Sequence, residues 1–250
     1  MKYAIIIALA LPHTALAEPL TIAAGKPSGA YDTASQRLSQ RLQQRNVDAA
    51  VLNYNGSDEI TLALCSKKAD IGYTQIDAIY TRANEGCMLT PLGFYGNEYA
   101  TIWFPPDSPY NELEDLDSSN TILVDTVGSG TDLFWSTIKA IEAEHGNGSY
   151  WAEASALNET PDLALTLAEI GDIDAVLLVR KANSPDFTGL EQNRWERGWI
   201  YDKDINDVEF NGKELYSSAD GDSAYEVRSF IVAGPNFDKT LTRQIQGALK

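Results

Sequence analysis

The stretch Leu20-Thr-Ile-Ala-Ala-Gly-Lys-Pro-Ser-Gly-Ala-Tyr31 decides the fold class, because it joins a strand pattern to a helix pattern through a Gly/Ser loop. Its first residues form a short apolar run that is typical of a buried strand. After the loop, Ala34, Leu38 and Leu42 repeat every four residues, which predicts a helix. Apolar runs and amphipathic stretches alternate along the rest of the chain, and this alternation favours an α/β architecture.

A polar loop between a predicted strand and a predicted helix occurs three times. The loops are Ser28-Gly29-Ala30-Tyr31, Asn55-Gly56-Ser57 and Gly128-Ser129-Gly130-Thr131. Each offers backbone N–H groups and hydroxyls beside the positive end of a helix, an arrangement that suits a carboxylate oxygen. One such loop can serve only as a helix cap, and Ser57 is expected to cap its helix. Three loops together favour one ligand cleft at the carboxyl ends of the strands.

Further strands and helices are predicted on both sides of Pro105-Pro106, which we expect to separate two lobes. The predicted strands cover residues 48–54, 69–74, 99–104, 121–125, 151–154, 174–179 and 228–233, and the predicted helices 57–66, 75–85, 131–146, 160–170 and 236–249. Residues 202–223 are rich in acids, Gly, Ser and Asn, which predicts irregular loops. Lobe I is expected to comprise residues 18–105 and 228–250, and lobe II residues 106–227.

Residues 1–17 have the pattern of a cleavable secretory signal. Lys2 supplies the positive charge, Ala4 to Leu11 the apolar run, and Ala15-Leu16-Ala17 the small residues before the cleavage site. The apolar run is shorter than the roughly 20 residues that span a bilayer. We therefore expect cleavage near Ala17-Glu18, a periplasmic or secreted product, and no direct membrane insertion.

The charge of the chain is strongly acidic. It holds 19 Lys and Arg against 36 Asp and Glu, for a formal net charge of −17. Such a charge disfavours nucleic acid and anionic membrane surfaces as partners. Because the acids are spread along the sequence, a well-solvated surface is a sufficient explanation for most of them.

The two cysteines, Cys65 and Cys87, are predicted to form a disulfide. Their number is even, and export would place them in an oxidising compartment. Two free buried thiols remain the alternative. Metal binding is disfavoured because no histidine lies near them in the sequence.

The sequence argues against common enzyme classes. His13 leaves with the signal, and His145 stands beside Gly146 at a predicted helix end, where a capping role is expected. Ser136 and Lys139 match a Ser-x-x-Lys pattern, but its companion motifs are absent. No Gly-x-Ser-x-Gly motif, nucleotide-binding loop or zinc spacing is present. We predict a non-enzyme without a cofactor, although paired carboxylates, as in glycosidases, are not excluded.

The segment Asp202-x-Asp204-x-Asn206 resembles the start of a calcium loop. Such a loop requires glycine at its sixth position and glutamate at its twelfth, where Asp207 and Lys213 stand. We therefore expect no metal site.

Several stretches, in this order, resemble the TAXI-type solute-binding proteins of TRAP transporters, within the type II periplasmic binding proteins. They are Leu20 to Tyr31, Asn55-Gly56-Ser57, Lys68-Ala-Asp70-Ile-Gly72-Tyr-Thr-Gln75-Ile-Asp77-Ala, Leu113-Glu-Asp-Leu116, Gly128-Ser-Gly-Thr131 and Gly171-Asp-Ile-Asp174-Ala175. The resemblance covers most of residues 20–180, and the segment after Arg180 matches poorly. It implies a two-lobe fold with a central cleft for a small organic acid or amino acid such as glutamate.

The resemblance also implies a set of ligand-binding residues. Side chains expected to contact the ligand are Ser28, Tyr31, Asn55, Ser57, Gln75, Ser129, Thr131 and Asp174, while Gly29, Gly56, Gly128 and Gly130 let the backbone approach it. Gln75 and Asp77 could instead cap a helix. Lys26, Arg82 and Arg180 are the possible counter-ions for an anionic ligand.

The leading hypothesis is an extracytoplasmic solute-binding protein that captures its ligand by hinge closure and delivers it to a TRAP-type membrane transporter. Two alternatives stay open. One is a periplasmic hydrolase that uses a carboxylate pair, and the other is a ligand-sensing subunit that docks on a membrane receptor.

Overall fold

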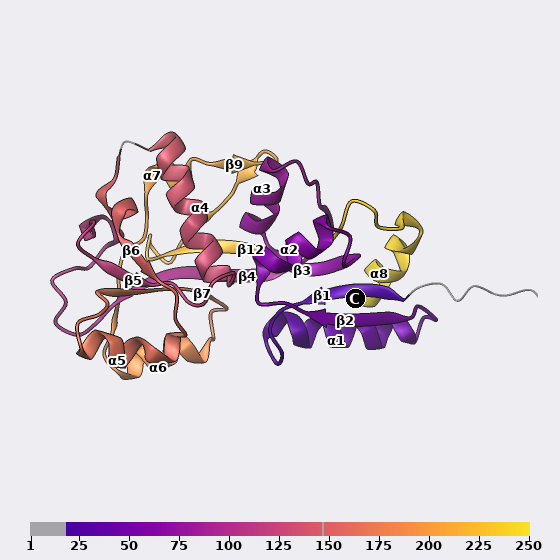
Figure 1. Cartoon of the computed structure of the whole chain (residues 1–250), viewed down its shortest axis with the longest axis horizontal. Helices are drawn as coiled ribbons and strands as arrows, with labels where there is room; N and C mark the ends of the chain where they lie inside the picture. Colours follow the sequence, from indigo (N-terminus) through magenta and orange to yellow (C-terminus); the bar gives the residue numbers. More distant parts are fainter. Residues whose placement is uncertain (1–18, 147) are drawn as a thin grey trace, which may run out of the picture.

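The computed structural model describes residues 19–146 and 148–250, so the signal segment predicted at residues 1–17 lies outside the described residues. The chain forms two α/β lobes side by side, with helices on both faces of the sheet in each (Figure 1). Lobe I denotes the part built around β1, β2 and β3, and lobe II the part built around β5, β6 and β7. Within the described residues, no helix is long and apolar enough to cross a membrane.

Lobe I alternates strands and helices. Its elements are β1 (Leu20–Ala24), α1 (Ala30–Gln43), β2 (Ala49–Asn53), α2 (Ser57–Cys65), β3 (Ile71–Gln75) and α3 (Ile76–Asn84), completed by η4 (Lys239–Leu241) and α8 (Thr242–Leu249) from the end of the chain. Leu38 and Leu42 of α1, on the four-residue spacing seen in the sequence, are buried against β1 together with Ile245 of α8. Burial of each such side chain stabilises the fold by about 1.5–3 kcal/mol.

Lobe II repeats the pattern with shorter elements. They are η1 (Leu113–Asp115), β5 (Thr121–Leu123), α4 (Gly130–His145), η2 (Tyr150–Glu153), β6 (Ser155–Leu157), η3 (Pro161–Leu163), α5 (Ala164–Glu169), β7 (Ala175–Arg180) and α6 (Pro185–Gln192), followed by β8 (Glu196–Arg197), α7 (Lys203–Asn206), β9 (Glu209–Phe210), β10 (Lys213–Glu214) and β11 (Ser217–Ala219). The apolar run of β7 is buried on both faces of the sheet, as expected for a central strand.

Two long strands, β4 (Thr90–Phe104) and β12 (Ala224–Ala233), join the lobes. The sheet order is β2-β1-β3-β12-β4-β7-β5-β6, so these antiparallel strands occupy its middle (Figure 1). β12 pairs with β3 of lobe I from Ser229 onward, whereas residues 99–103 of β4 pair with β7 of lobe II. The lobe boundaries predicted at residues 105/106 and 227/228 stay a prediction.

The α/β fold class is confirmed, and most predicted elements are present with shifted ends. The strand predicted at residues 151–154 is wrong: a 3₁₀ turn, η2, stands there because fully buried Trp151 packs on Trp135, and the strand follows at β6. Ser57 does not cap α2, because it is the first residue of the helix. The N-cap position is taken by Gly56, which has no side chain to cap the helix. Residues 202–223 contain short ordered elements rather than only loops.

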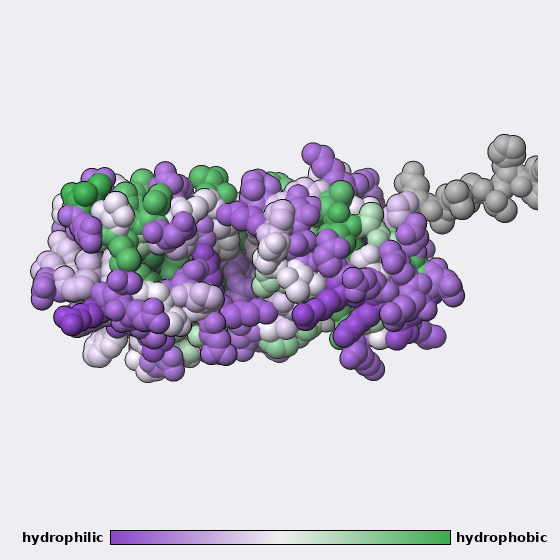
Figure 2. All heavy atoms as spheres, turned by 90° about the horizontal axis from the view of Figure 1, so that it is seen from below, coloured by the Kyte–Doolittle hydropathy of each residue, from purple (hydrophilic) through white to green (hydrophobic). Residues whose placement is uncertain are grey.

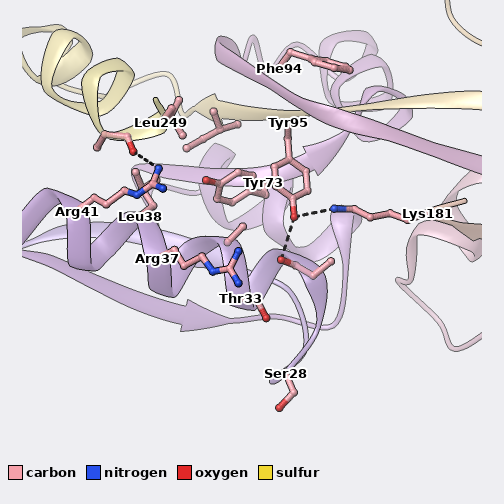
Figure 3. Close-up of a pocket in the computed structure, with 14 residues that line it drawn as sticks. Ser28, Thr33, Arg37, Leu38, Arg41, Tyr73, Phe94, Tyr95, Lys181 and Leu249 are labelled. Atoms are coloured by element: carbon pink, nitrogen blue, oxygen red, sulfur yellow. Dashed lines mark hydrogen bonds between the residues drawn. The ribbon is translucent and has the colours of Figure 1, made fainter. Parts of the chain in front are cut away.

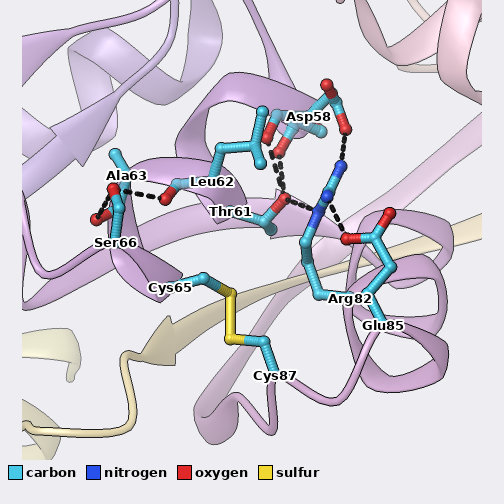
Figure 4. The surroundings of a disulfide bond; sticks show 10 residues. Asp58, Thr61, Leu62, Ala63, Cys65, Ser66, Arg82, Glu85 and Cys87 are labelled. Atoms are coloured by element: carbon cyan, nitrogen blue, oxygen red, sulfur yellow. Dashed lines mark hydrogen bonds and ion pairs between the residues drawn. A yellow bond between two sulfur atoms is a disulfide. The ribbon is translucent and has the colours of Figure 1, made fainter.

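The disulfide predicted between Cys65 and Cys87 is confirmed (Figure 4). It joins the end of α2 to the segment after α3 and closes a loop with a sequence separation of 22, which in the chain-entropy model is worth about 3 kcal/mol. Beside it, buried Arg82 pairs with Asp58 and Glu85. Arg82 is therefore occupied within lobe I and does not line the cleft described next.

Candidate functional site

A cleft of about 390 Å³ lies between the two lobes. Figure 2 shows hydrophilic residues gathered at this hollow junction, seen from the side of α1 and α6. Predicted site residues that line it are Gly29, Tyr31, Asn55, Gly56, Ser57, Gln75, Ser129 and Gly130. The structure therefore brings most of the predicted residues of both lobes to one cavity.

The lobe I loop is held by Asp32, in the first turn of α1. Its carboxylate accepts hydrogen bonds from the Ser28 N–H (2.8 Å) and from Asn53 Nδ2 (2.9 Å). The same Asn53 amide donates to the Gly25 carbonyl at 2.7 Å. These bonds lower the pKa of Asp32, that from Asn53 most, and they fix Ser28 in a left-handed conformation (φ 68°).

The lobe II loop has the same construction. The Asp132 carboxylate accepts from the Gly128 N–H (2.9 Å) and from Asn158 Nδ2 (2.8 Å), and Asn158 also donates to the Asp125 carbonyl at 3.0 Å. Gly128 is left-handed as well (φ 77°). One difference is the residue before the helix, since the Ser129 hydroxyl accepts from the Asp132 N–H at 3.1 Å.

Loops from the two lobes touch each other across the cleft. A Cβ atom added to Gly56 would lie 2.3 Å from the Gly128 carbonyl oxygen, and one added to Gly130 would lie 2.3 Å from Gln75 Oε1. Lys26 Nζ also donates to Thr126 Oγ1 at 2.6 Å. The structure thus has the lobes in contact, and only glycine fits at position 56, where the added Cβ would meet backbone atoms.

The lobe I side of the cleft carries a buried carboxylate. Glu98 of β4 is 8% exposed and accepts from the Tyr31 hydroxyl (2.8 Å) and from Gln75 Nε2 (2.6 Å). Burial raises the pKa of Glu98, while the bonds from Tyr31 and Gln75 oppose that rise. Gln75 is 1% exposed, and its Oε1 has no hydrogen-bond partner among the described residues. This wall of the cleft is rich in acceptors.

The lobe II side carries a guanidinium. Arg180, at the end of β7, donates to Asp125 (2.6 Å), Asp186 (2.6 Å) and the Thr131 hydroxyl (3.3 Å). Burial acts to lower its pKa, but the two carboxylates outweigh burial and the pKa is raised. The Thr131 hydroxyl also accepts from the Val179 N–H at 3.0 Å. Arg180 is thus a fixed cation whose charge is balanced within lobe II.

Three helices begin at the cleft. Ala30 of α1, Ser57 of α2 and Gly130 of α4 are their first residues, and all three line the cavity. The first N–H groups of a helix have no intrahelical acceptor and carry its positive end. The side chains of Lys26 and Lys181 add two positive charges at the same cavity. An anionic oxygen is therefore the group that this part of the cleft is built to hold.

Four predicted site residues lie elsewhere. Ser28 lines a neighbouring hollow (Figure 3), Gly128 forms the contact with Gly56 through its carbonyl oxygen, and Thr131 is fully buried behind Arg180. Asp174 precedes β7, and its carboxylate accepts from the Thr121 N–H at 2.8 Å, so it joins β5 to β7 at the end of the strands away from Arg180. Asp70 makes the same bond to Thr21 in lobe I. The ligand contact predicted for Asp174 is not supported.

The cleft is also lined by Glu98, Asp125 and Lys181, which the sequence analysis did not predict as site residues. Glu98 carried a usable signal, because it is a single charge inside the long strand pattern from Thr90 to Phe104. Lys181 directly follows Arg180, the last residue of β7, at the carboxyl end of the strand, where ligands bind in such sheets.

The chain resembles solved structures of binding proteins. No family model matches the sequence, and no curated protein matches it significantly. XAC2383 from Xanthomonas citri bound to ATP superposes with a TM-score of 0.63 at 10% identity, covering 92% of this chain and 82% of that one. The GluR0 ligand-binding core from Nostoc punctiforme in complex with L-glutamate gives 0.54 at 16% identity, covering 92% and 91%. The arginine-, lysine-, histidine-binding protein ArtJ from Geobacillus stearothermophilus gives 0.52 at 16%, covering 93% and 88%.

The chain has the fold of a type II periplasmic binding protein. At these identities the likeness establishes the fold alone. The neighbours are ligand-binding proteins rather than enzymes, and they include proteins for amino acids and for sulfonates.

Proposed function

We propose that this chain is an extracytoplasmic solute-binding protein that captures a small amino acid or organic acid, glutamate-like in size, between its lobes. The observation that carries the proposal is that the cleft offers groups of both polarities. Glu98 and the free Gln75 Oε1 offer acceptors, while the N-termini of three helices, Lys26 and Lys181 offer positive charge. A molecule with both an ammonium and a carboxylate group complements both sets of groups.

Within that class, the buried carboxylate favours an amino acid over a plain dicarboxylate. Glu98 makes two hydrogen bonds, but it has no Lys or Arg within ion-pair distance among the described residues. An ammonium group of a ligand would pair with Glu98 and offset the cost of burying its charge. A second carboxylate placed there would be repelled.

Binding is proposed to act through hinge closure. The residues that join the lobes are β4 and β12, and a ligand that contacts both walls stabilises the closed arrangement in proportion to its extra contacts there. The resemblance to TAXI-type proteins supports delivery to a TRAP-type membrane transporter as the next step. Such a role fits export after cleavage near Ala17-Glu18.

A thermal-shift screen of amino acids and dicarboxylates tests the proposal. A true ligand at about 100 times its Kd stabilises the folded state by about 2.7 kcal/mol, a rise in Tm of roughly 5–10 °C for a chain of this size. Gln75→Leu should abolish the shift, whereas Gln43→Leu, an exposed change in the same lobe, should keep it. Recovery of the compound unchanged is expected. Turnover of the compound would support the hydrolase alternative and contradict a binding protein.

A further inference from the structure

Carboxylates converge in lobe II at a place far from the cleft. Oxygen atoms of Glu142, Asp202 and Asp204 all lie within 4.8 Å of one another. Glu142 is 12 residues from the first residue of α4, so it lies about 18 Å along the helix from the cleft. Figure 1 shows the end of α4 beside α7 at the top of lobe II. The cluster is therefore separate from the proposed solute site.

The buried charges of this cluster lack counter-ions. Glu142 and Asp202 are each 4% exposed. No Lys or Arg of the described residues lies within ion-pair distance of Glu142, Asp202 or Asp204. A buried carboxylate without a cation is costly, because the protein interior solvates its charge poorly.

One oxygen in the cluster is an unused acceptor. Glu142 Oε1 accepts from the N–H groups of Gly148 (3.1 Å) and Ser149 (2.7 Å). Its other oxygen, Oε2, is buried and has no hydrogen-bond partner among the described residues. Buried polar atoms are nearly always satisfied, so this oxygen points to a ligand that supplies positive charge.

The remaining carboxylates are held in place by their surroundings. Asp202 accepts from the indole N–H of buried Trp151 at 3.1 Å and from the N–H groups of Asp204 and Ile205. Asp204 follows Asp202 in the first turn of α7. Three carboxylates therefore share one small region of lobe II.

We propose that Glu142, Asp202 and Asp204 form a calcium site. Ca²⁺ takes six to eight oxygen ligands at about 2.3–2.6 Å, so the ligand oxygens of one ion lie at most about 5 Å apart, and the three oxygens of the cluster meet this limit. Structural zinc sites are built mainly from His and Cys ligands, and Mg²⁺ demands a stricter octahedral geometry. This site departs from the sequence prediction of no metal, and it does not depend on the proposed solute function.

The ion would have a structural role. It would join the end of α4 to the start of α7, two segments that are 60 residues apart in the chain and that meet at Glu142 and Asp202. Calcium modules of extracellular proteins bind with Kd values on the order of 10⁻⁴–10⁻³ M, and a similar affinity is expected here.

Thermal unfolding of the metal-stripped chain in CaCl2 tests the site. About 10 mM CaCl2 should raise Tm by roughly 3–8 °C over the EDTA value, with a smaller rise in MgCl2. Glu142→Gln should remove the calcium response while keeping or raising Tm in EDTA. Glu144→Gln, an exposed change on the same helix, should leave the response intact. Equal calcium responses in the wild-type protein and in Glu142→Gln would overturn the proposal.

A second readout covers the case in which Glu142→Gln does not fold. Tb³⁺ replaces Ca²⁺ at oxygen sites and emits when a nearby tryptophan is excited, and the Trp151 indole bonds directly to Asp202. We expect Tb³⁺ emission that excess CaCl2 quenches and that Asp204→Asn, at a less buried ligand, weakens at least tenfold. Absence of calcium-sensitive emission in the wild-type protein would also overturn the proposal.

Discussion

The loops Ser28–Asp32 of lobe I and Gly128–Asp132 of lobe II are built alike, yet they stand before opposite charges. In each, an aspartate in the first helical turn binds the loop N–H and an asparagine from a neighbouring segment. Behind the first loop lies the buried acid Glu98, and behind the second lies Arg180 with its two carboxylates. One loop design thus serves two different walls of a single cleft.

The shared loops position the backbone, and the strands behind them set the charge of each wall. Lobe II balances its cation internally, through Asp125 and Asp186. Lobe I leaves Glu98 and Asp77 without a Lys or Arg within ion-pair distance among the described residues. Lobe I is therefore the wall on which a ligand's positive charge has most to gain.

The largest expected effect concerns the uncompensated acids of lobe I. Burial raises the pKa of Asp77 to about 7, against the bonds from the Ala78 N–H and the Tyr216 hydroxyl. The folded state then holds a proton that the unfolded state releases near pH 4, so its stability falls as pH rises from 4 to 7. The loss is up to about 4 kcal/mol.

Asp77→Asn should remove most of this slope of the free energy of unfolding against pH. Urea unfolding of both proteins at pH 5 and pH 7.5 measures it. The free energy of unfolding should fall between the two pH values in the wild-type protein and change much less in the variant. Asp172→Asn, an exposed change in lobe II, should leave the slope as it is. If the free energy of unfolding of Asp77→Asn still falls with pH as in the wild-type protein, buried Asp77 is not the cause of the pH dependence, and the contrast drawn between the two lobes is wrong.

The next largest effect concerns the contact between the loops. Gly56→Val places a Cβ 2.3 Å from the Gly128 carbonyl oxygen and 2.9 Å from Ser129 Cα. We expect the lobes to stay apart and ligand affinity to fall about 100-fold, or about 2.7 kcal/mol, in calorimetric titration. Gly189→Ala, whose Cβ would meet nothing within 4 Å, is the control. Wild-type affinity in Gly56→Val would show that closure does not require this contact.

The smallest expected effect is a difference in stability between substitutions at Ser28 and at Gly128, one in each loop. Both Ser28 and Gly128 are left-handed, and a Cβ at Gly128 would meet only Glu59 atoms at 3.9 Å. Gly128→Ser should therefore cost about 1 kcal/mol through its backbone alone. Ser28→Gly should change stability little, because relief of strain is offset by the entropy of the unfolded chain. Equal changes in Tm for Gly128→Ser and Ser28→Gly in thermal unfolding would contradict this account of the two left-handed positions.

The sequence predicted the elements that depend on local pattern. Leu20 to Ala24 and the repeat of Leu38 and Leu42 lie where a strand and a helix form, and the even number of cysteines predicted Cys65–Cys87. These signals are short-range, so no knowledge of the tertiary structure is needed to read them.

The site was harder to predict because its charges come from distant strands. Glu98 reaches Tyr31 across 67 residues, and Arg180 reaches Asp125 across 55. Asp174 was misplaced although it precedes its strand, which puts it at the amino end and away from the cleft. Asp202 and Asp204 resemble the start of a calcium loop in the sequence. Glu142 lies 60 residues before Asp202, and no loop motif links it to them.

Glu98 is expected to receive the ammonium group of a bound amino acid. Calorimetric titration of L-glutamate and 2-oxoglutarate, which differ in that group, tests it in the wild-type protein, in Glu98→Gln and in Glu191→Gln, an exposed control. Glu98→Gln should weaken L-glutamate binding about tenfold, or about 1.4 kcal/mol, and leave 2-oxoglutarate binding unchanged or improved. Equal weakening of both ligands, or unchanged binding of L-glutamate, would contradict the account.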